Sequence, residues 1–406
     1  MNVLFLTLSK MLTVEYRGIY SDLMRKFRNE GHILYIVSPT ERRDGRETQL
    51  IETEGVHILS VKTLNIQKTN VLEKGIGQLS IEHLYKQAIK KYCEGVKFDL
   101  ILYSTPPITF PNVITYVKEC NPGAHTYLLL KDIFPQNAVD MGMLKKTGVK
   151  SLLYKFFRNK EKKLYALSDY IGCMSPANAK FVLDHNKEVA LRHAQSPIVE
   201  VAPNSIELVE EAPNRKDDIR KKYGLPTDKP LLIYGGNLGV PQGIPFLIEC
   251  LKANKDRVDC HFVVVGSGTF YPRLEKWVNA EKPASVTLMQ RLPKEDYDRL
   301  VAACDIGLIF LDYRFTIPNF PSRLLSYLEY KMPVIACTDP NCDTGLIANE
   351  NGFGMWCPSN NVEAFIQTVN DILKRDVKAM GEKGYEFLKQ NYLVDNTYNT
   401  IMNHFK

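Results

Sequence analysis

Apolar and polar residues alternate along this chain in two series, and each series has the pattern of strands separated by helices. Short apolar runs have the length of buried strands, and the stretches between them repeat apolar positions at a helical period. Strands of the first series are predicted at 3–8, 32–37, 100–103, 126–130, 170–174 and 199–202. Strands of the second series are predicted at 231–234, 261–265, 305–310 and 334–337. This alternation is typical of parallel sheets with helical crossovers.

The break between the two series predicts two domains. Three prolines and a run of mixed charge indicate an exposed linker with a short helix at 208–230. We expect doubly wound Rossmann-like domains at 1–207 and 231–388, and a C-terminal helix at 389–406 that packs back on the first domain. Because parallel sheets of this kind bind ligands at the carboxyl ends of their strands, the two domains would face each other across a ligand cleft.

Composition excludes several protein classes. The chain has 406 residues, of which 45% are hydrophobic and 24% charged, so a disordered or collagen-like protein does not fit. No stretch has the roughly 18 uncharged apolar residues of a membrane span, and the apolar start is too short for a signal peptide, which predicts a cytoplasmic protein. The nine cysteines and eight histidines form no metal-binding pattern, so we expect reduced thiols, no metal and no cofactor.

Positive charge is concentrated in one segment. Residues 1–200 carry a net charge of +8 and residues 201–406 one of −2, and residues 145–163 alone carry +7. Around a helix, the apolar residues of 149–164 lie on one arc, so the segment either contacts an anionic membrane surface or packs its apolar arc on a sheet. No nucleic-acid fold is recognisable, so nucleic acid is disfavoured. The residues predicted to face a membrane are Lys145, Lys146, Lys150, Lys155, Phe156, Phe157 and Arg158.

Two segments of the second half are candidates for an anion site. The turn 235–243 is rich in glycine and joins a strand to a helix, where backbone N–H groups can approach an anion; a plain tight turn is equally compatible. The helix that follows Pro321 and Ser322 has Arg323 in its first turn, where a cation is unfavourable unless an anion binds there. The planar guanidinium of Arg323 could hold a diphosphate, or the side chain could simply face solvent.

The order and spacing of several motifs resemble those of retaining, nucleotide-sugar-dependent glycosyltransferases of family 4, which have two Rossmann-like domains (the GT-B type). The similar segments are Gly236–Gly243, Val265–Gly268, Arg291–Pro293 with Asp305, Lys331–Ala336, Asp132–Gln136 and Pro203–Asn204. The segment Asp132–Gln136 is similar to the Asp-Leu-Trp-Pro-Glu motif of a branch that acts on lipid-linked bacterial surface glycans. The resemblance implies donor contacts at Gly236, Asn237, Gln242, Gly266, Arg291, Leu292, Ser322, Arg323 and Ser326, and acceptor contacts at Arg17 and Gly18.

The chain departs from the family at charged positions. Pro318 and Ser326 stand where the family has two glutamates, and Asn237 and Gln242 stand where it has a basic pair. Glu329 is a candidate substitute for a missing carboxylate. The resemblance implies a reaction that needs no metal ion, as is usual for the family.

Lys131 and Asp132 follow a strongly apolar run and therefore lie at the carboxyl edge of the first sheet. Asp132 could orient or deprotonate an acceptor hydroxyl, or it could cap the turn that contains Pro135. The predicted catalytic residues are Asp132, Lys131 and Arg323.

The resemblance implies a glycosyltransferase at the inner face of the cell membrane. It would move a sugar from a UDP-linked or related donor to a polyprenyl-diphosphate-linked saccharide during the synthesis of capsule or O-antigen polysaccharide. A nucleotide-sugar epimerase or hydrolase of the same fold is one alternative. A second alternative is a weakly catalytic or non-catalytic partner that binds a nucleotide or glycan and assists another transferase.

Overall fold

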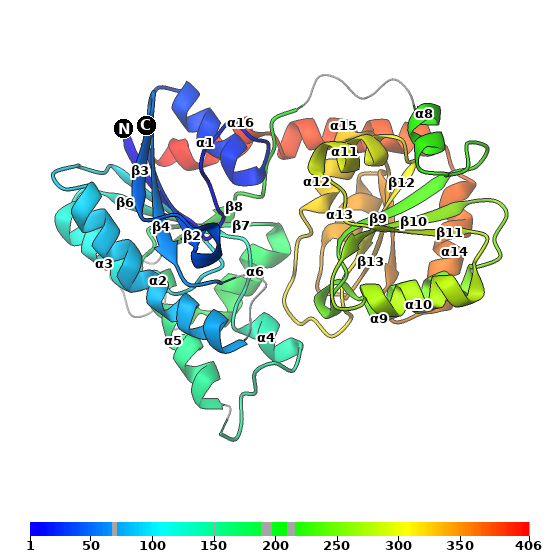
Figure 1. Cartoon of the computed structure of the whole chain (residues 1–406), viewed down its shortest axis with the longest axis horizontal. Coiled ribbons are helices and arrows are strands. Elements are labelled where there is room, and N and C mark those ends of the chain that lie inside the picture. The colour runs from blue at the N-terminus through cyan, green and yellow to red at the C-terminus, as the bar shows by residue number, and fades with distance from the viewer. Residues whose placement is uncertain (67–70, 150, 188–196, 209–215, 406) are drawn as a thin grey trace. The chain divides into compact units, whose positions relative to one another are not determined.

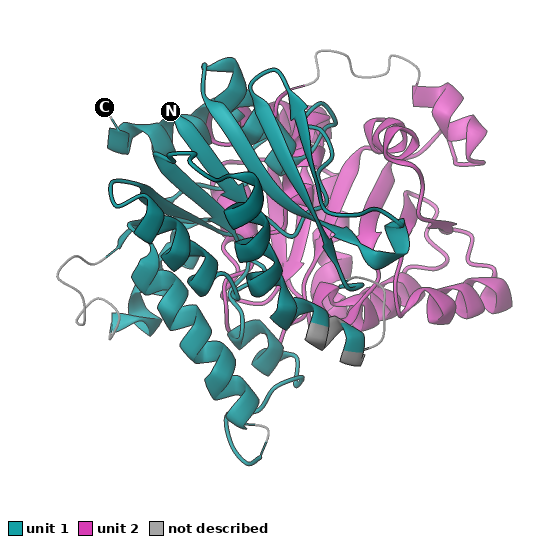
Figure 2. Ribbon diagram, turned by 60° about the vertical axis from the view of Figure 1, so that its left-hand side comes forward, with its two compact units in different colours: residues 1–206, 394–406 teal, residues 207–393 magenta. Residues whose placement is uncertain are grey.

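The computed structural model describes residues 1–66, 71–149, 151–187, 197–208 and 216–405. The chain divides into two compact units, here called unit 1 (residues 1–206 and 394–406) and unit 2 (residues 207–393) (Figure 2). In each unit, helices cover both faces of a mainly parallel β-sheet (Figure 1). The predicted fold class, two Rossmann-like α/β domains, is confirmed.

The sheet of unit 1 has eight strands in the order β3-β4-β2-β1-β5-β6-β7-β8, and its pairs are parallel except for β3 with β4. The chain builds the sheet outward from β1 in one direction and then from β5 in the other, so the strand order reverses between β1 and β5. That is the point at which doubly wound sheets bind ligands. The strands are β1 Asn2–Leu6, β2 Ile33–Glu41, β3 Gln49–Thr53, β4 Val56–Thr63, β5 Leu100–Ser104, β6 His125–Leu130, β7 Tyr170–Cys173 and β8 Ile198–Val201.

The helices of unit 1 connect these strands and include the last residues of the chain. They are α1 Ile19–Asn29, α2 Val71–Tyr92, α3 Pro111–Cys120, α4 Gln136–Asp140, α5 Ser151–Leu167, α6 Pro176–His185 and α16 Val394–Met402, with short 3-10 turns at Arg42–Asp44 and Asn403–Phe405. Helix α16 packs on α1, and its Ile401 is fully buried in the core of unit 1.

The sheet of unit 2 has six parallel strands in the order β11-β10-β9-β12-β13-β14, and its strand order reverses between β9 and β12. The strands are β9 Leu231–Asn237, β10 His261–Ser267, β11 Val286–Gln290, β12 Ile306–Phe310, β13 Val334–Thr338 and β14 Gly354–Pro358. The helices are α8 Lys216–Lys222, α9 Ile244–Ala253, α10 Tyr271–Glu281, α11 Lys294–Ala302, α12 Arg323–Glu329, α13 Thr344–Glu350, α14 Val362–Leu373 and α15 Val377–Asn391, with a 3-10 turn at Val240–Gln242.

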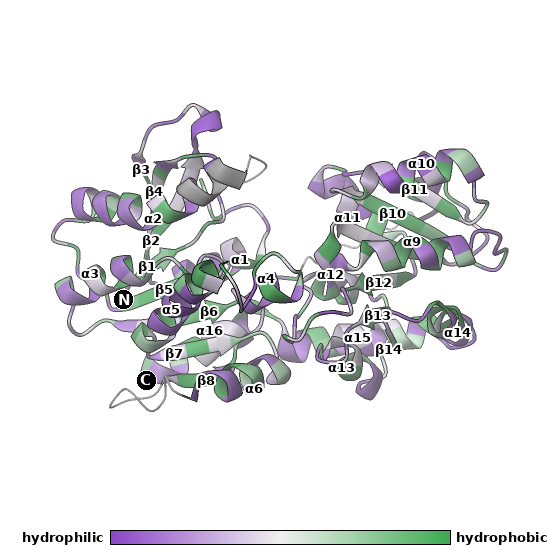
Figure 3. Ribbon diagram, turned by 90° about the horizontal axis from the view of Figure 1, so that it is seen from below, coloured by the Kyte–Doolittle hydropathy of each residue, from purple (hydrophilic) through white to green (hydrophobic). Residues whose placement is uncertain are grey.

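The strongest sequence signals came from strands that are buried on both faces. β5, β12 and β13 are buried at every position, as is usual for parallel strands between two helical layers. Figure 3 shows hydrophobic residues along the strands and hydrophilic residues on outward-facing helices. The hydrophobic pattern did not predict β3, β4, β11 and β14. Of these, β3, β11 and β14 are edge strands whose residues are largely half-buried or exposed, so their periodicity is weak.

Part of the predicted linker is a helix of unit 2. On α8, Arg220 donates hydrogen bonds to the carbonyl of Ala303 (2.8 Å) and to the Asp305 carboxylate (2.7 Å), which attaches the helix to the end of α11 and the start of β12. Among the described helices, we find no segment that is both long and apolar enough to span a membrane.

Candidate functional site

The glycine-rich turn lies at the point where the strand order of unit 2 reverses. Strand β9 is buried through Gly235, whereas Gly236 and Asn237 are exposed at its carboxyl end. The adjacent end of β12 is held to the turn by a hydrogen bond from the Asp312 N–H to the Pro241 carbonyl (3.1 Å). The turn therefore lies at the usual ligand-binding edge of the sheet.

Glycine is required at the neighbouring strand end. A Cβ on Gly266, at the end of β10, would overlap with the backbone carbonyl of Gly236. Gly236 itself has a φ of 138°, which side chains rarely adopt. The predicted donor-contact residues Gly236 and Gly266 thus allow two strand ends to approach each other closely.

Arg323 reaches this turn from α12. Its guanidinium carbon lies 4.5 Å from the centre of the Tyr234 ring, and Nη2 lies 3.1 Å from the place where a Cβ of Gly236 would be. Nη1 is buried and has no hydrogen-bond partner among the described residues. Burial raises the pKa of nearby Tyr297 to about 12, so that phenol does not neutralise the guanidinium. A buried donor atom without a hydrogen-bond acceptor is costly, and the geometry leaves Nη1 able to bind an anion.

Tyr327 fixes α12 in this position. Its hydroxyl donates to the carbonyls of Ile233 (3.1 Å) and Leu308 (3.3 Å), one on each of the two central strands. A Cβ on Gly307 would overlap with the Tyr327 ring, so the glycine makes room for it. No local sequence pattern predicted this contact, although a Gly in a buried strand is a known sign of close packing.

The other donor candidates on α12 and the glycine turn are close to Arg323 in sequence or space. Ser322 occupies the N-cap position of α12, but its side chain makes no capping hydrogen bond. Ser326 is half-buried one turn further along. The amide of Asn237 donates to that of Gln242 (2.6 Å), so two neutral groups pair where the family has two cations.

Glu329 does not replace a missing carboxylate at the turn. It is buried at the far end of α12, six residues from Arg323, which corresponds to about 9 Å along a helix axis.

Arg291 and Asp305 belong to segments that together resemble one base-binding stretch. In the structure, however, Arg291 lies at the carboxyl ends of the strands and Asp305 at their amino ends. Arg291 is exposed, and Leu292 half-buried, after the carboxyl end of the edge strand β11. Asp305 precedes β12 at the amino edge, where it accepts hydrogen bonds from Arg220 and from the Leu231 N–H (2.8 Å). Their predicted grouping is wrong because Asp305 anchors α8 instead.

In unit 1, the predicted acceptor loop joins β1 to α1. The Gly18 N–H donates to the fully buried carboxylate of Asp22 (2.9 Å), which also accepts from Arg25 (2.7 Å). Arg25 in turn donates to the Tyr16 carbonyl (3.1 Å). The pair of Asp22 and Arg25 therefore fixes the backbone around Arg17 and Gly18, a role that the sequence analysis missed.

Lys131 and Asp132 follow β6 at the same edge. Both oxygens of Asp132 accept from the Asn137 amide (2.7 and 2.9 Å), and burial, partly offset by these bonds, raises the pKa of this carboxyl to about 6. Lys131 donates to the Ala202 carbonyl (3.1 Å), and burial lowers its pKa to about 7. Asp132 does not cap the start of α4, where Pro135 occupies the cap position. Both groups titrate near neutral pH, which suits them to proton transfer.

The predicted membrane-facing residues separate into two groups on α5 and the loop before it. Lys145, Lys146, Lys155 and Phe156 are exposed, and Lys150 lies outside the described residues. Phe157 packs edge-on against Phe134, with ring centres 4.9 Å apart, and Arg158 pairs with Glu161 (2.5 Å). The outward orientation predicted for Phe157 and Arg158 is therefore wrong, because both side chains contact other residues of unit 1.

The apolar arc of α5 is exposed at its first turns and buried at its end. Leu164 is fully buried, whereas five apolar side chains at the start of α5 and in the preceding loop are 42–87% exposed. These residues are here called the α5 tip, and the start of α5 is the end of that helix farthest from the sheet of unit 1 (Figure 1). They are Met143, Val149, Leu152, Leu153 and Phe156.

Comparison with known proteins shows that unit 2 is similar to a glycosyltransferase family. Residues 215–387 match the family model "Glycosyl transferases group 1". The matched segment covers most of unit 2. The match supports the predicted enzyme class, a glycosyltransferase, for the chain.

Relatives extend the likeness beyond this domain. The chain is 25% identical to "Probable glycosyltransferase WbjE" of Pseudomonas aeruginosa over 332 residues, which cover 80% of this chain and 78% of that protein. It is 33% identical over 161 residues, 39% of each chain, to a protein of Escherichia coli K12 named as a colanic acid biosynthesis glycosyl transferase, WcaI.

Solved structures share the two-domain fold. Sucrose-phosphate synthase of Thermosynechococcus elongatus superposes with a TM-score of 0.72 at 14% identity, covering all of this chain and 98% of that one. Anabaena Alr3699/HepE, solved with UDP, gives a TM-score of 0.65 at 14% identity, covering all of this chain and 99% of that one. Together with the sheet topologies, these likenesses establish the GT-B fold.

Within the described residues, no group of three His, Cys, Asp or Glu side chains is arranged to hold a metal ion.

Proposed function

We propose that this glycosyltransferase moves a sugar from a UDP-sugar to a polyprenyl-diphosphate-linked saccharide in bacterial polysaccharide synthesis, with retention of configuration at the transferred carbon. The observation that carries the proposal is the buried, unpartnered Nη1 of Arg323 beside the glycine turn. The UDP bound to Anabaena HepE, which has the same fold, supports the choice of base. The likeness to WcaI supports polysaccharide synthesis.

In this reaction the bond between the sugar C1 and the diphosphate oxygen breaks, and C1 bonds to an acceptor hydroxyl. Negative charge accumulates on the departing diphosphate, and the fixed charge of Arg323 and the N–H groups of the glycine turn would stabilise it. Because Arg323 supplies a permanent positive charge, we also propose that the reaction needs no metal ion and proceeds in a chelator.

Unit 1 would bind the acceptor. The loop held by Asp22 would contact the saccharide through Arg17 and Gly18. Asp132 would accept the proton of the attacking hydroxyl or orient that hydroxyl, since its raised pKa makes it a stronger base than an ordinary aspartate.

Release of UDP from UDP-sugars, measured with a lipid-linked acceptor and with chelator present, tests the proposal. We expect UDP to appear only when both substrates are present. Release without acceptor would instead indicate a hydrolase. Conversion of the UDP-sugar into an isomer would indicate an epimerase.

A non-catalytic nucleotide-binding partner is the second candidate, and the residues Pro318 and Ser326 at the family's two glutamate positions favour it. A partner protein would bind UDP through Arg323 but would release none from any UDP-sugar under these conditions.

We also propose that the α5 tip inserts into an anionic membrane surface, with lysines 145 and 155 against the headgroups. Changing Leu152 and Leu153 together to Ser should lower binding to anionic vesicles at least tenfold, because each inserted leucine contributes about 1–2 kcal/mol. Vesicle co-sedimentation measures this. Leu346→Ser, at a similarly exposed leucine of α13, is the matched control. Equal binding by the control and the double variant would contradict membrane insertion.

A further inference from the structure

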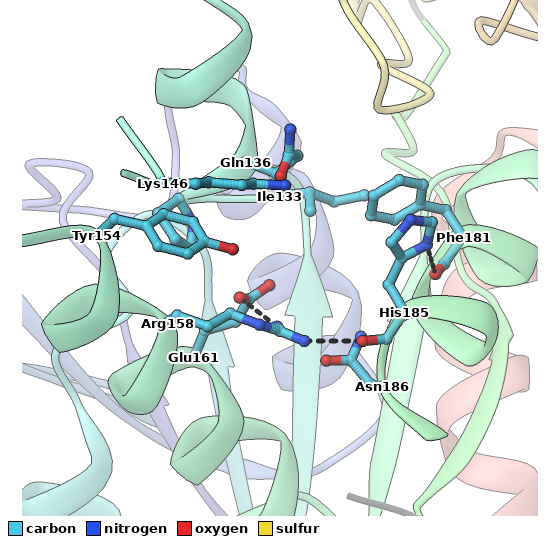
Figure 4. Close-up of a pocket in the computed structure, with 10 residues that line it drawn as sticks. Ile133, Gln136, Lys146, Tyr154, Arg158, Glu161, Phe181, His185 and Asn186 are labelled. Carbon is cyan, nitrogen blue, oxygen red and sulfur yellow. Dashed lines mark hydrogen bonds and ion pairs between the residues drawn. The ribbon is translucent and has the colours of Figure 1, made fainter. Parts of the chain in front are cut away.

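A small cavity lies between α5 and α6 in unit 1, next to the α5 tip. Its volume is about 80 Å³. Tyr154 and Arg158 line it from α5, and Phe181 and Asn186 line it from the region of α6. Figure 4 shows these side chains pointing into the space between the two helices, with Lys146 at its upper rim. The volume equals that of about two or three water molecules in the liquid, which is enough for one phosphate group.

The charges in the cavity leave one cation for a ligand. Arg158 is balanced by Glu161 (2.5 Å) and also donates to the His185 carbonyl (2.7 Å). Lys146 lies 5.7 Å from the centre of the Tyr154 ring and has no carboxylate partner among the described residues. The ion pair therefore adds no net charge to the cavity lining, and Lys146 gives the cavity its net positive charge.

Asn186 adds an unused hydrogen-bond acceptor. Its side-chain nitrogen donates to the Val182 carbonyl (2.8 Å), whereas its oxygen is buried and has no partner among the described residues. The residue is 8% exposed, so leaving this oxygen unpaired has a free-energy cost. A hydroxyl group of a bound molecule would satisfy it, for example on the sugar that carries a phosphate.

The position of the cavity connects two parts of unit 1. At one side its lining includes Ile133, the residue after Asp132, and at the other it includes Lys146 and Tyr154, beside the α5 tip. In one bound molecule, a reacting hydroxyl could lie at Asp132, a phosphate in the cavity and a lipid chain at the α5 tip.

We propose that this cavity binds one phosphate of the diphosphate by which the acceptor is joined to its polyprenyl chain, with Lys146 as the cation and Asn186 as the hydrogen-bond acceptor for the adjacent sugar. The inference rests on the proposed lipid-linked acceptor and assigns to it a specific binding site.

Vesicle flotation of the full-length protein without any nucleotide tests the site. Phosphatidylcholine vesicles with undecaprenyl phosphate are compared with vesicles of equal charge that contain phosphatidylglycerol. We expect wild-type protein to bind the undecaprenyl phosphate vesicles about tenfold more tightly, a preference that corresponds to about 1.4 kcal/mol. Lys146→Glu should abolish the preference.

Lys145→Glu is the matched control, since it changes the charge equally on the neighbouring residue, which does not line the cavity. It should weaken binding to both kinds of vesicle and keep the preference. Asn186→Asp, which places a negative charge in the cavity, should also abolish the preference, with thermal unfolding as a check on folding. The same preference in Lys146→Glu and Lys145→Glu would overturn the proposal.

Soluble inorganic pyrophosphate distinguishes a lipid from a free ligand. If it stabilised wild-type protein but not Lys146→Glu in thermal unfolding, and vesicle preference were absent, the cavity would be a site for free phosphate and the proposal would be wrong. Because no turnover is measured, an inactive protein can still show the preference. A protein that is active but lacks the vesicle preference would disprove the phosphate site but not the transferase function.

Discussion

Arg323→Ala should remove nucleotide binding while leaving the fold at least as stable as before. In wild-type protein the guanidinium stacks on Tyr234 beside Gly236 with Nη1 unpartnered, so its burial has a free-energy cost that the diphosphate would offset. We expect kcat/KM to fall about 10²–10³-fold, the range found when one preorganised donor to a developing anion is lost. The thermal shift produced by UDP should disappear.

Two further variants test this explanation. Arg323→Lys keeps the charge but loses the planar fork, so its activity should lie between those of wild type and Arg323→Ala. Arg299→Ala changes an exposed arginine of α11 and should keep both the UDP shift and the turnover. If Arg323→Ala instead lowered the unfolding temperature without ligand and kept the UDP shift, Arg323 would be a structural residue.

Asp132→Asn should lower kcat/KM about 10²–10⁴-fold and remove the acidic limb of the pH profile. Those magnitudes are typical of a lost general base. The pKa of Asp132 is raised from 3.8 to about 6 by burial. In wild-type protein, activity should therefore rise about tenfold per pH unit below pH 6, where the carboxyl is still protonated, and level off above it.

The same pKa shift predicts how the free energy of unfolding changes with pH. Because the folded state binds the Asp132 proton more tightly than the unfolded state, this group stabilises the fold at low pH, and that contribution is lost as pH rises between 3.8 and about 6. Urea unfolding of Asp132→Asn should lack this loss. Asp184→Asn, at an exposed carboxylate of α6, serves as the control and should change neither the pH profile nor the rate. An unchanged acidic limb in Asp132→Asn would assign the titration to another group.

The sequence by itself determined the fold class and the edges where ligands bind. Apolar runs such as those of β9 and β12 can be buried only between two helical layers, and the turns after them must then lie at the carboxyl edge. Arg323 could also be identified from the sequence as a candidate anion-binding residue, because a cation in a predicted first helical turn is unfavourable without an anion.

Tertiary structure decided which groups meet. Arg291 and Asp305 are 14 positions apart in the chain, but one follows a strand and the other precedes one, so they lie at opposite edges. The contacts of Tyr327 with two strands, and of Asp22 with the Gly18 loop, join residues through packing that no local pattern encodes. The helical period of α5 predicted its apolar arc correctly but not its burial, because burial depends on where the rest of unit 1 ends. The α5 tip is exposed because the rest of unit 1 covers the later turns of that helix but not the apolar side chains of its first turns.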